Sequence, residues 1–312
     1  MTKKILGITH ALTDQIIPVS DEELSSIDLT CGGWKPFSIC TNKKGLEELL
    51  KKESVKKYLG GAPTNVIRGL NNLGYDCNLI GNIGEDELGK NYINVLEKES
   101  INPLFHIYSG EKSGECYVFI TPNKKRSFYS NASIADNFKD LDTYLSKNEN
   151  FDLVFTSGYE FSSNPSKFID FIQLLKQKGT KIAFDIANGN IAKKNLPEFK
   201  EMIKLSNILF ISDEESEIAF GGLQDWMFKD KICAYKKGTK GSEIYQNKNK
   251  AIIPCYKADK LVNDNGAGDS YAAGFLHAYL ENRDIELCGI LASLIAKKVC
   301  QQEESWYKNN LS

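Results

Sequence analysis

The chain has 312 residues, of which 41% are hydrophobic and 26% charged, the proportions of an ordinary globular domain. Its 39 lysines and arginines nearly balance its 41 aspartates and glutamates, for a formal net charge of -2. This balance provides no basic field for nucleic acid, and no apolar run has the length of a membrane span or signal peptide. We therefore expect a cytoplasmic protein without a nucleic-acid or membrane partner. The eight cysteines contain no Cys-x-x-Cys pair, which favours reduced thiols over a zinc cluster.

Short apolar runs typical of strands alternate along the chain with longer amphipathic runs typical of helices. The first strand is expected at KILGIT and is followed by a helix at residues 62–73, the strand CNLIG and a helix at residues 85–100. Later strands are expected at CYVFIT, LVFTSG, KIAFDIA, ILFIS, ICAYKK, EIYQ and AIIPCY. Later helices are expected at residues 165–178, 213–220, 267–282 and 284–300. The alternation predicts an α/β fold, in which helices cover both faces of a mostly parallel sheet and ligands bind at the carboxyl ends of its strands.

Two regions interrupt this alternation. Residues 16–59 contain a Cys-Gly-Gly turn and a lysine-rich helix with spaced leucines, and residues 116–130 have the pattern of a β-hairpin. The lysines are interpreted as a solvated helix face. We expect one domain over residues 1–312, with a small β-rich lid formed by segments at about 15–59 and 104–131.

The loop before the last two helices contains the run NDNGAGD, residues 263–269. Glycines where a loop enters a helix let backbone N–H groups converge on an anion, and the helix dipole adds to the attraction. A carboxylate there would repel a phosphate, unless Asp269 takes the proton of a hydroxyl that attacks that phosphate. The run therefore indicates a phosphoryl-transfer centre. The alternative is a plain Asn-Gly turn, with Asp269 serving only the helix dipole.

A second glycine pair opens the helix expected at residues 62–73. Gly60 and Gly61 permit close approach of a ligand to the backbone, and Asn65 offers an amide in the first turns of that helix. Asp14 ends a strand-like segment, where its carboxylate can accept hydrogen bonds from sugar hydroxyls. Each feature has a simpler alternative, because a Gly-Gly pair is often a turn and Asp14 can cap one.

Taken in this order, the motifs strongly resemble the ribokinase/PfkB family of carbohydrate and nucleoside kinases. The likeness extends from ILGITHALTD to AKKVCQQ and takes in LGYDCNLIGNIGEDELGKNYINVLEKESI, TPNKKRSFYSNASI and KKGTKGSEIY. It implies a ribokinase-like three-layer αβα domain with a small β-rich lid. It also implies transfer of the γ-phosphoryl group of ATP to a hydroxyl, with Mg²⁺ and, in many members, a potassium-like cation.

The resemblance implies a role for each matching residue. Asp269 matches the catalytic base, and the anion hole matches Gly266, Ala267 and Gly268. The acceptor-binding positions of the family match Asp14, Gly60, Gly61 and Asn65. His10 stands where adenosine-kinase-like members carry a neutral amide, so it either contacts the acceptor or simply packs at the sheet edge.

On the nucleotide side, the family's positions match Gly238, Gly241 and Asn265, and Glu215 matches a glutamate that organises Mg²⁺ through water. Two departures occur. In the family pattern D-T-x-G-A-G-D the first two positions are Asn263 and Asp264, which moves a negative charge along the loop and puts the monovalent cation in question. In the pattern N-x-x-E the asparagine is Ser212, and Mg²⁺ dependence is still expected because the nucleotide supplies most ligands.

The acceptor is predicted less sharply than the reaction. Asn265 and the run YAAGF that follows Asp269 are closer to adenosine-kinase-like members, so adenosine is the first acceptor we expect. The alternatives are a sugar kinase of the fructokinase, ribokinase or ketodeoxygluconate kinase type, and a catalytically silent homologue that binds a nucleotide or sugar. Family members use their lid sheets to dimerise or remain monomeric, so both a monomer and a homodimer through the lid are open.

Overall fold

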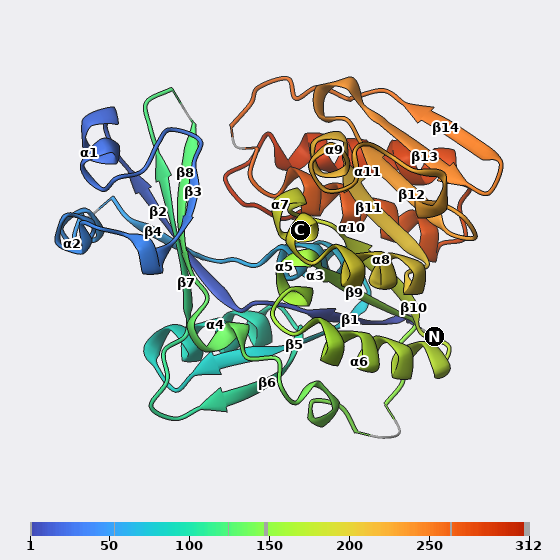
Figure 1. Cartoon of the computed structure of the whole chain (residues 1–312), viewed down its shortest axis with the longest axis horizontal. Coiled ribbons are helices and arrows are strands. Elements are labelled where there is room, and N and C mark those ends of the chain that lie inside the picture. Colours follow the sequence, from blue (N-terminus) through green and yellow to red (C-terminus); the bar gives the residue numbers. More distant parts are fainter. Residues whose placement is uncertain (1, 53, 124, 147–148, 263, 309–312) are drawn as a thin grey trace.

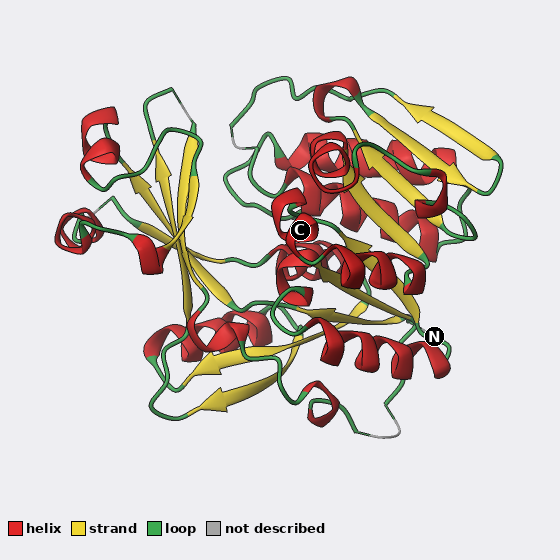
Figure 2. Ribbon diagram, viewed as in Figure 1, coloured by secondary structure: helices red, strands yellow, loops and turns green. Residues whose placement is uncertain are grey.

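The structure is a computed structural model that describes residues 2–52, 54–123, 125–146, 149–262 and 264–308 (Figure 1). Asn263, the first departure from the family pattern, lies outside the described residues. Within the described part, the strands form a nine-stranded sheet and a separate five-stranded sheet. Figure 2 shows the small sheet standing beside the helix-covered large one.

The large sheet is mostly parallel, and an antiparallel hairpin forms one of its edges. Its strands follow in the order β14 (Asn249–Ile253), β13 (Ser242–Gln246), β12 (Ile232–Lys236), β11 (Ile208–Ser212), β10 (Lys181–Asp185), β9 (Leu153–Ser157), β1 (Lys4–Ile8), β5 (Asp76–Gly84) and β6 (Asn102–Tyr108). Helices on both faces bury its side chains, which explains the almost unbroken apolar runs of the central strands.

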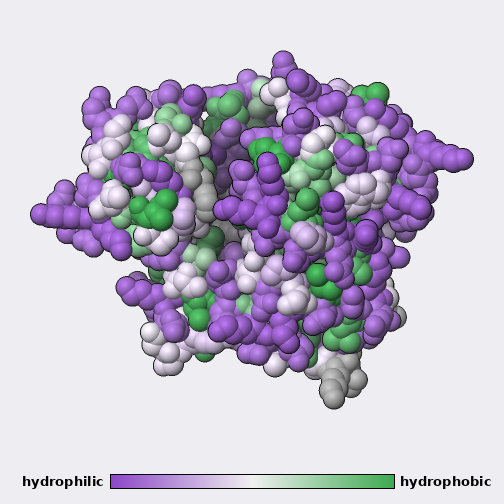
Figure 3. Space-filling view, in the orientation of Figure 1, coloured by the Kyte–Doolittle hydropathy of each residue, from purple (hydrophilic) through white to green (hydrophobic). Residues whose placement is uncertain are grey.

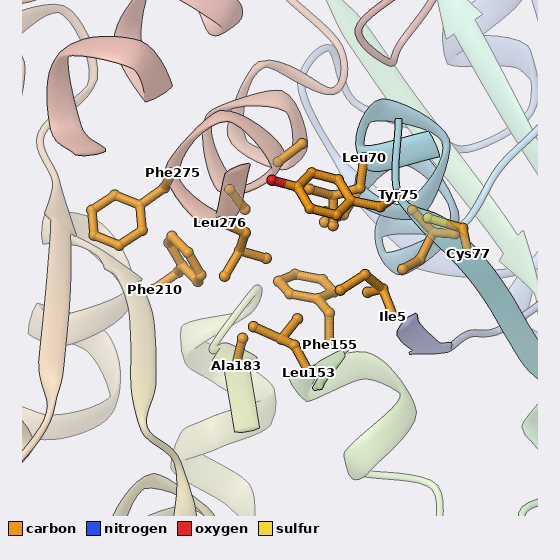
Figure 4. Close-up of a cluster of buried hydrophobic side chains, with 14 of the residues drawn as sticks. Ile5, Leu70, Tyr75, Cys77, Leu153, Phe155, Ala183, Phe210, Phe275 and Leu276 are labelled. Atoms are coloured by element: carbon orange, nitrogen blue, oxygen red, sulfur yellow. The ribbon is translucent and has the colours of Figure 1, made fainter. Parts of the chain in front are cut away.

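Helices on one face of the large sheet are α3 (Ala62–Asn72), α4 (Glu87–Lys98), α10 (Ala267–Leu280) and α11 (Ile285–Val299). Those on the other face are α5 (Gly158–Phe161), α6 (Pro165–Gln177), α7 (Gly189–Lys194), α8 (Leu196–Leu205) and α9 (Asp213–Phe220). Figure 4 shows the first core, where Phe155 of β9 and Phe210 of β11 lie below Phe275 of α10. The rings of Phe210 and Phe275 meet edge to face, 5.5 Å between centroids. Burying each such side chain contributes roughly 1.5–3 kcal/mol, so this core fixes α10 against the sheet.

The small sheet has two different faces. Its strands follow in the order β3 (Trp34–Pro36), β8 (Arg126–Asn131), β7 (Gly114–Ile120), β2 (Leu12–Pro18) and β4 (Lys56–Leu59). Alternate residues, among them Ile17, Phe119 and Tyr129, point to a core shared with α1 (Asp21–Ser26) and α2 (Lys43–Leu50). The residues between them face the large domain and line a cleft described below.

The predicted fold class is confirmed: helices cover both faces of a mostly parallel sheet, and a small sheet lies apart. The prediction that Asp14 ends the first strand-like segment was wrong. The first strand ends at Ile8, and Asp14 lies inside β2 of the small sheet. The predicted lid range 104–131 also includes most of β6, which pairs with β5 at the edge of the large sheet. Its Pro103 weakened the strand pattern, but an edge strand tolerates a proline.

The helices α7 and α8 were missed, although a proline near the start of α8 and the apolar spacing of FKEMIKL are helix signals. Among the described residues, no helix combines the length and apolar character that crossing a membrane requires.

Candidate active site

A cleft of about 470 Å³ lies between the two sheets, at the carboxyl ends of the strands of the large one. Figure 3 shows the surface hollowed between the two parts of the molecule. The large domain lines the cleft with polar residues that include Asn65, Asp185, Glu215, Lys236 and Asp269. The small sheet contributes Leu12, Asp14, Cys116, Phe128 and Ser130. The location agrees with the expectation that ligands bind beyond the carboxyl ends of parallel strands.

Gly266 and Gly268 form the turn at the start of α10. Gly266 caps the helix with a φ of 74°, and a Cβ there would lie 1.7 Å from the carbonyl oxygen of Ser305, so only glycine fits. A Cβ on Gly268 would meet open space, with the Nζ of Lys236 nearest at 3.9 Å. N–H groups in the first turn of a helix have no partner within the helix. The turn can therefore hold an anion, as its sequence predicted.

Asp269 follows the turn as the third residue of α10. The Nδ2 of Asn65, on the neighbouring helix α3, donates a hydrogen bond of 2.8 Å to its Oδ2. Burial raises the pKa of Asp269 to about 7, although the hydrogen bond from Asn65 and the charge of Lys236 act in the opposite direction. A carboxyl group that titrates near neutral pH is suited to accept a proton from a substrate.

Asp14 lies on the small sheet, and the negative charge of Asp269 acts on its carboxyl group. Burial, and then the charge of Asp269, raise the pKa of Asp14 to about 7. Gly60 lies directly behind it, because a Cβ on Gly60 would lie 2.1 Å from the Oδ1 of Asp14. Gly61 has a φ of 97°, and its Cβ would approach the carbonyl oxygen of His10 to 2.5 Å. The glycine pair is thus required for the close approach of β2 and α3.

His10 lines the cleft, but neighbouring side chains hold its ring. Its Nε2 lies 2.9 Å from the Oγ of Ser163 and 3.3 Å from a carboxylate oxygen of Asp136. The ring stacks on Phe138, with 5.6 Å between centroids. The backbone N–H of His10 donates to the buried carboxylate of Glu160 at 3.0 Å. His10 therefore packs against its neighbours at the sheet edge and also forms part of the cleft wall.

A second cavity of about 590 Å³ adjoins the cleft. Gly238 and Gly241 line it from the loop between β12 and β13, and α11 lines its other side. The two cavities share four lining residues, which are Lys236, Asp264, Ala267 and Gly268. Asn265 was predicted on the nucleotide side, but it lines the cleft, and its Nδ2 donates to the Oγ of Ser305 at 3.0 Å. Two ligand-sized cavities therefore meet at the glycine turn that begins α10.

Lys236 and Asp185 belong to the site although sequence reasoning missed them. They are the last residues of β12 and β10, and their Nζ and Oδ2 atoms lie 2.7 Å apart. The sequence could have indicated Lys236, because this lysine ends a buried strand directly before a glycine-bearing loop. Asp185 was harder to find, since only its position at the end of the apolar run KIAFD indicates it.

Glu215, which the family resemblance matches to Mg²⁺, lines the cleft. Burial raises the pKa of Glu215 and the charge of Lys236 lowers it, while the backbone N–H of Ser212 donates to its Oε2 at 2.7 Å. No group of three metal-ligating side chains occurs among the described residues. A partly buried carboxylate at the cleft wall fits contact with a metal through water, with phosphate oxygens as the main ligands.

Comparison with known proteins identifies the family. The model of the pfkB family of carbohydrate kinases matches residues 22–309. The chain belongs to this family. It is accordingly a phosphotransferase that acts on a hydroxyl group of a sugar or nucleoside, and its family implies ATP as the phosphoryl donor.

Relatives of this pfkB-family kinase include both acceptor classes. It is 29% identical over 283 residues to the nucleoside kinase of Methanocaldococcus jannaschii, covering 88% of this chain and 90% of the relative. It is 28% identical over 261 residues to a 5-dehydro-2-deoxygluconokinase of Clostridium botulinum, covering 76% of each. The solved adenosine kinase of Sinorhizobium meliloti has the same fold, with a TM-score of 0.86 at 19% identity over 100% of this chain and 97% of that one.

At both departures from the family patterns, this pfkB-family kinase forms contacts of its own. Asp264 forms an ion pair with Arg126 of the small sheet, 2.9 Å between Oδ1 and Nη1. The shifted negative charge thus connects the loop before the glycines to β8, and at 71% exposure of Asp264 the pair contributes about 0–1 kcal/mol. Ser212 caps α9 by accepting the N–H of Glu215 at 3.1 Å. In this chain the serine and Glu215 form a capping box.

A larger cavity of about 730 Å³ lies elsewhere, at the amino ends of the strands, where Lys3, Asp152 and Lys181 line it. Neither glycine turn reaches it, and parallel sheets bind their ligands at the opposite edge. The candidate active site of this pfkB-family kinase is therefore the pair of cavities at the start of α10.

Proposed function

We propose that this kinase transfers the γ-phosphoryl group of ATP to a hydroxyl of a neutral nucleoside or sugar, with adenosine as the preferred acceptor. One observation carries the proposal: the two cavities meet at Ala267 and Gly268, and Asp269 lines only the cleft that the small sheet closes. A phosphate held in the turn would have the nucleotide on one side and the acceptor hydroxyl, beside its base, on the other.

In the proposed reaction Asp269 accepts the proton of the acceptor hydroxyl. The hydroxyl oxygen forms a bond to the γ-phosphorus, the bond from that phosphorus to the β–γ bridging oxygen breaks, and ADP leaves with the electron pair. The amide of Asn65 orients Asp269, and the first-turn N–H groups of α10 bind the charged oxygens. Mg²⁺, which Glu215 would hold through water, would supply further neutralisation of the phosphates.

The charges in the cleft support a neutral acceptor. Five carboxylates line it, namely Asp14, Glu160, Asp185, Glu215 and Asp269, and the exposed Asp264 adds a sixth at its rim. Lys236 is the single lysine or arginine among the described residues of the lining, and it is already paired with Asp185. An acidic acceptor such as a deoxygluconate would add its own carboxylate to these six, with Lys236 as the single lysine or arginine of the described lining to balance them. The many carboxylates of the cleft lining thus disfavour sugar acids as acceptors.

Two features support a nucleoside. Phe128 of β8 presents an aromatic ring from the small sheet, against which a base can stack. The Oδ1 of Asn65 is buried without a hydrogen-bond partner among the described residues, so a ribose hydroxyl could satisfy it. The carboxylate of Asp14 offers a second acceptor for such hydroxyls. The nucleoside kinase and adenosine kinase among the similar proteins agree with this choice.

An acceptor panel tests the proposal. Release of ADP from ATP and Mg²⁺ would be measured with adenosine, guanosine, cytidine, ribose, fructose and 5-dehydro-2-deoxygluconate, each with and without potassium. We expect the highest kcat/KM with adenosine. A preference for the sugar acid would contradict the neutral acceptor. Measurable ATP binding without turnover of any acceptor would instead identify a catalytically silent homologue.

We also propose that the protein is a monomer and that the small sheet acts as its lid. The face of the small sheet that points away from the cleft is already buried under α1 and α2, where Leu24 and Leu46 complete its core. No open sheet face remains there, within the described residues, for a second copy to cover. Sedimentation equilibrium should give the mass of one chain, and a dimer dissociated by changes in β2 or β7 would overturn this proposal.

A further inference from the structure

Lys236 occupies an unusual position for a lysine. It lines both cavities, its side chain is only 17% exposed, and the nearest neighbour of an added Cβ on Gly268 would be its Nζ. The ammonium group therefore lies beside the anion-binding turn, on the path that joins the nucleotide cavity to the acceptor cleft. Burying a charged group at such a position is costly, so its retention there needs a reason.

The surroundings keep this lysine charged. Burial lowers the pKa of Lys236, but the carboxylates of Asp185 and Glu215 outweigh this and raise it above its ordinary value. A permanent positive charge cannot act as a proton donor or acceptor in the transfer. It can act only through electrostatics and hydrogen bonds.

Asp185 holds the lysine from one side. Its Oδ2 accepts from the Nζ of Lys236 at 2.7 Å, and its Oδ1 accepts from the backbone N–H of Ala187 at 3.0 Å. Ala187 has a φ of 58°, a conformation that is uncommon for alanine and that tightens the turn after β10. An ammonium has three N–H donors, and the bond to Asp185 uses one of them. The remaining donors are available to a phosphate in the neighbouring turn.

We propose that Lys236 is a catalytic residue that contacts the transferring phosphoryl group and stabilises its charge in the transition state. The inference rests on the proposed function. In the transfer the acceptor oxygen bonds to the γ-phosphorus, the bond to the β–γ bridging oxygen breaks, and the hydroxyl proton goes to Asp269. Lys236 remains protonated throughout and neutralises charge on the oxygens of the phosphoryl group that passes to the acceptor. Asp185 is a positioning residue that aims it.

A purely structural role is the competing explanation, because Lys236 also balances the charges of the buried Asp185 and the partly buried Glu215. The double variant Lys236→Met with Asp185→Asn separates the two explanations, since it removes the uncompensated carboxylate along with the lysine. Melting temperatures of all variants would verify that they fold. Lys237→Met serves as the control, because that neighbouring lysine pairs with Glu243 at 2.9 Å outside the cleft.

We expect Lys236→Met to lower kcat about 10²–10³-fold, the effect of removing one transition-state donor, with the KM of adenosine changed by less than about threefold. The double variant should remain equally slow, and Lys237→Met should match wild type. Recovery of kcat to within about tenfold of wild type in the double variant would show that the lysine is structural.

Calorimetry provides a readout that does not depend on turnover. ADP with aluminium fluoride and adenosine mimics the transferring group, and Lys236→Met should bind this combination about 100-fold more weakly while ADP alone binds within about threefold of wild type. Equal affinity of the variant and wild type for ADP–aluminium fluoride would overturn the inference. A failure of the proposed function is distinct, because it would appear as absence of turnover in wild type itself.

Discussion

The two walls of the cleft differ in how they are built and in what they offer. The wall on the large domain combines a helix start with a partly buried carboxylate and a partly buried ammonium, and the cores on the two faces of the sheet hold these groups in place. The wall on the small sheet is formed by β2, β7 and β8, which contribute a leucine, a phenylalanine, a cysteine, a serine and a single carboxylate. The difference fits the proposed function, in which the first wall performs the transfer and the second recognises the acceptor.

Asp14 is the residue for which the assignment to one wall is least distinct. It belongs to the small sheet, but the charge of Asp269 contributes to its raised pKa. The negative charge of Asp269 on the large domain therefore acts on Asp14 across the cleft. Substitutions on one wall should change kcat, and substitutions on the other should change the KM of the acceptor.

The largest effect should come from Asp269→Asn on the catalytic wall. Loss of the base should lower kcat about 10²–10⁴-fold while the KM of adenosine changes little. Steady-state kinetics would measure both, with Asp170→Asn, an exposed carboxylate on α6, as the control. Turnover close to that of wild type would mean that Asp269 is not the base.

The pH dependence should be the next largest effect. The base acts when deprotonated, and the pKa values of Asp269 and Asp14 are both about 7. Activity as kcat/KM should therefore rise from pH 5 to 7, by up to about tenfold per unit, and level off above.

Stability should run in the opposite direction over the same range. A carboxyl group with a raised pKa keeps its proton in the folded state at a pH where the unfolded chain has lost it, so the free energy of unfolding falls as pH rises from about 4 to 7. Melting temperatures across this range would measure the slope. Asp269→Asn should flatten it, and an unchanged slope would show that this carboxyl titrates normally.

Asp14→Asn should affect the recognition wall. Replacing a carboxylate that accepts from a hydroxyl removes about 1.5–3 kcal/mol of binding, which corresponds to a rise in the KM of adenosine of about 10–100-fold. The control is Glu115→Gln, because Glu115 lies on the opposite face of the same sheet, next to Cys116 of the cleft. If kcat fell and KM did not, Asp14 would belong to the catalytic wall.

Phe128→Ala should produce the smallest change and the most selective one. Loss of stacking, worth about 0.5–1.5 kcal/mol, should raise the KM of adenosine about 3–10-fold and leave that of ribose unchanged. Phe128→Leu keeps an apolar side chain without the ring and should recover only part of the loss. Equal effects on adenosine and ribose would argue against a base at this position.

Much of the fold was predictable because it depends on local patterns. Apolar runs such as ILFIS and the amphipathic helices have periods that a single segment displays, and both were found where expected. The turn at Gly266 was predictable for the same reason, since a helix start with glycines is contiguous in sequence. The strand containing Asp14 was harder, because KILGIT runs into it with only three residues between the two strands.

Contiguous sequence was enough to locate the glycine turn at the start of α10, the carboxylate beside it and the family to which the chain belongs. Only the tertiary structure brought Lys236 to Asp185, Arg126 to Asp264 and Asp14 to Gly60. The first of these contacts depends on β10, β11 and β12 lying side by side, and the second depends on a small sheet folding over the loop. Strand order is decided by how helices cover both faces of the sheet, which is a property of the whole core and not of any segment.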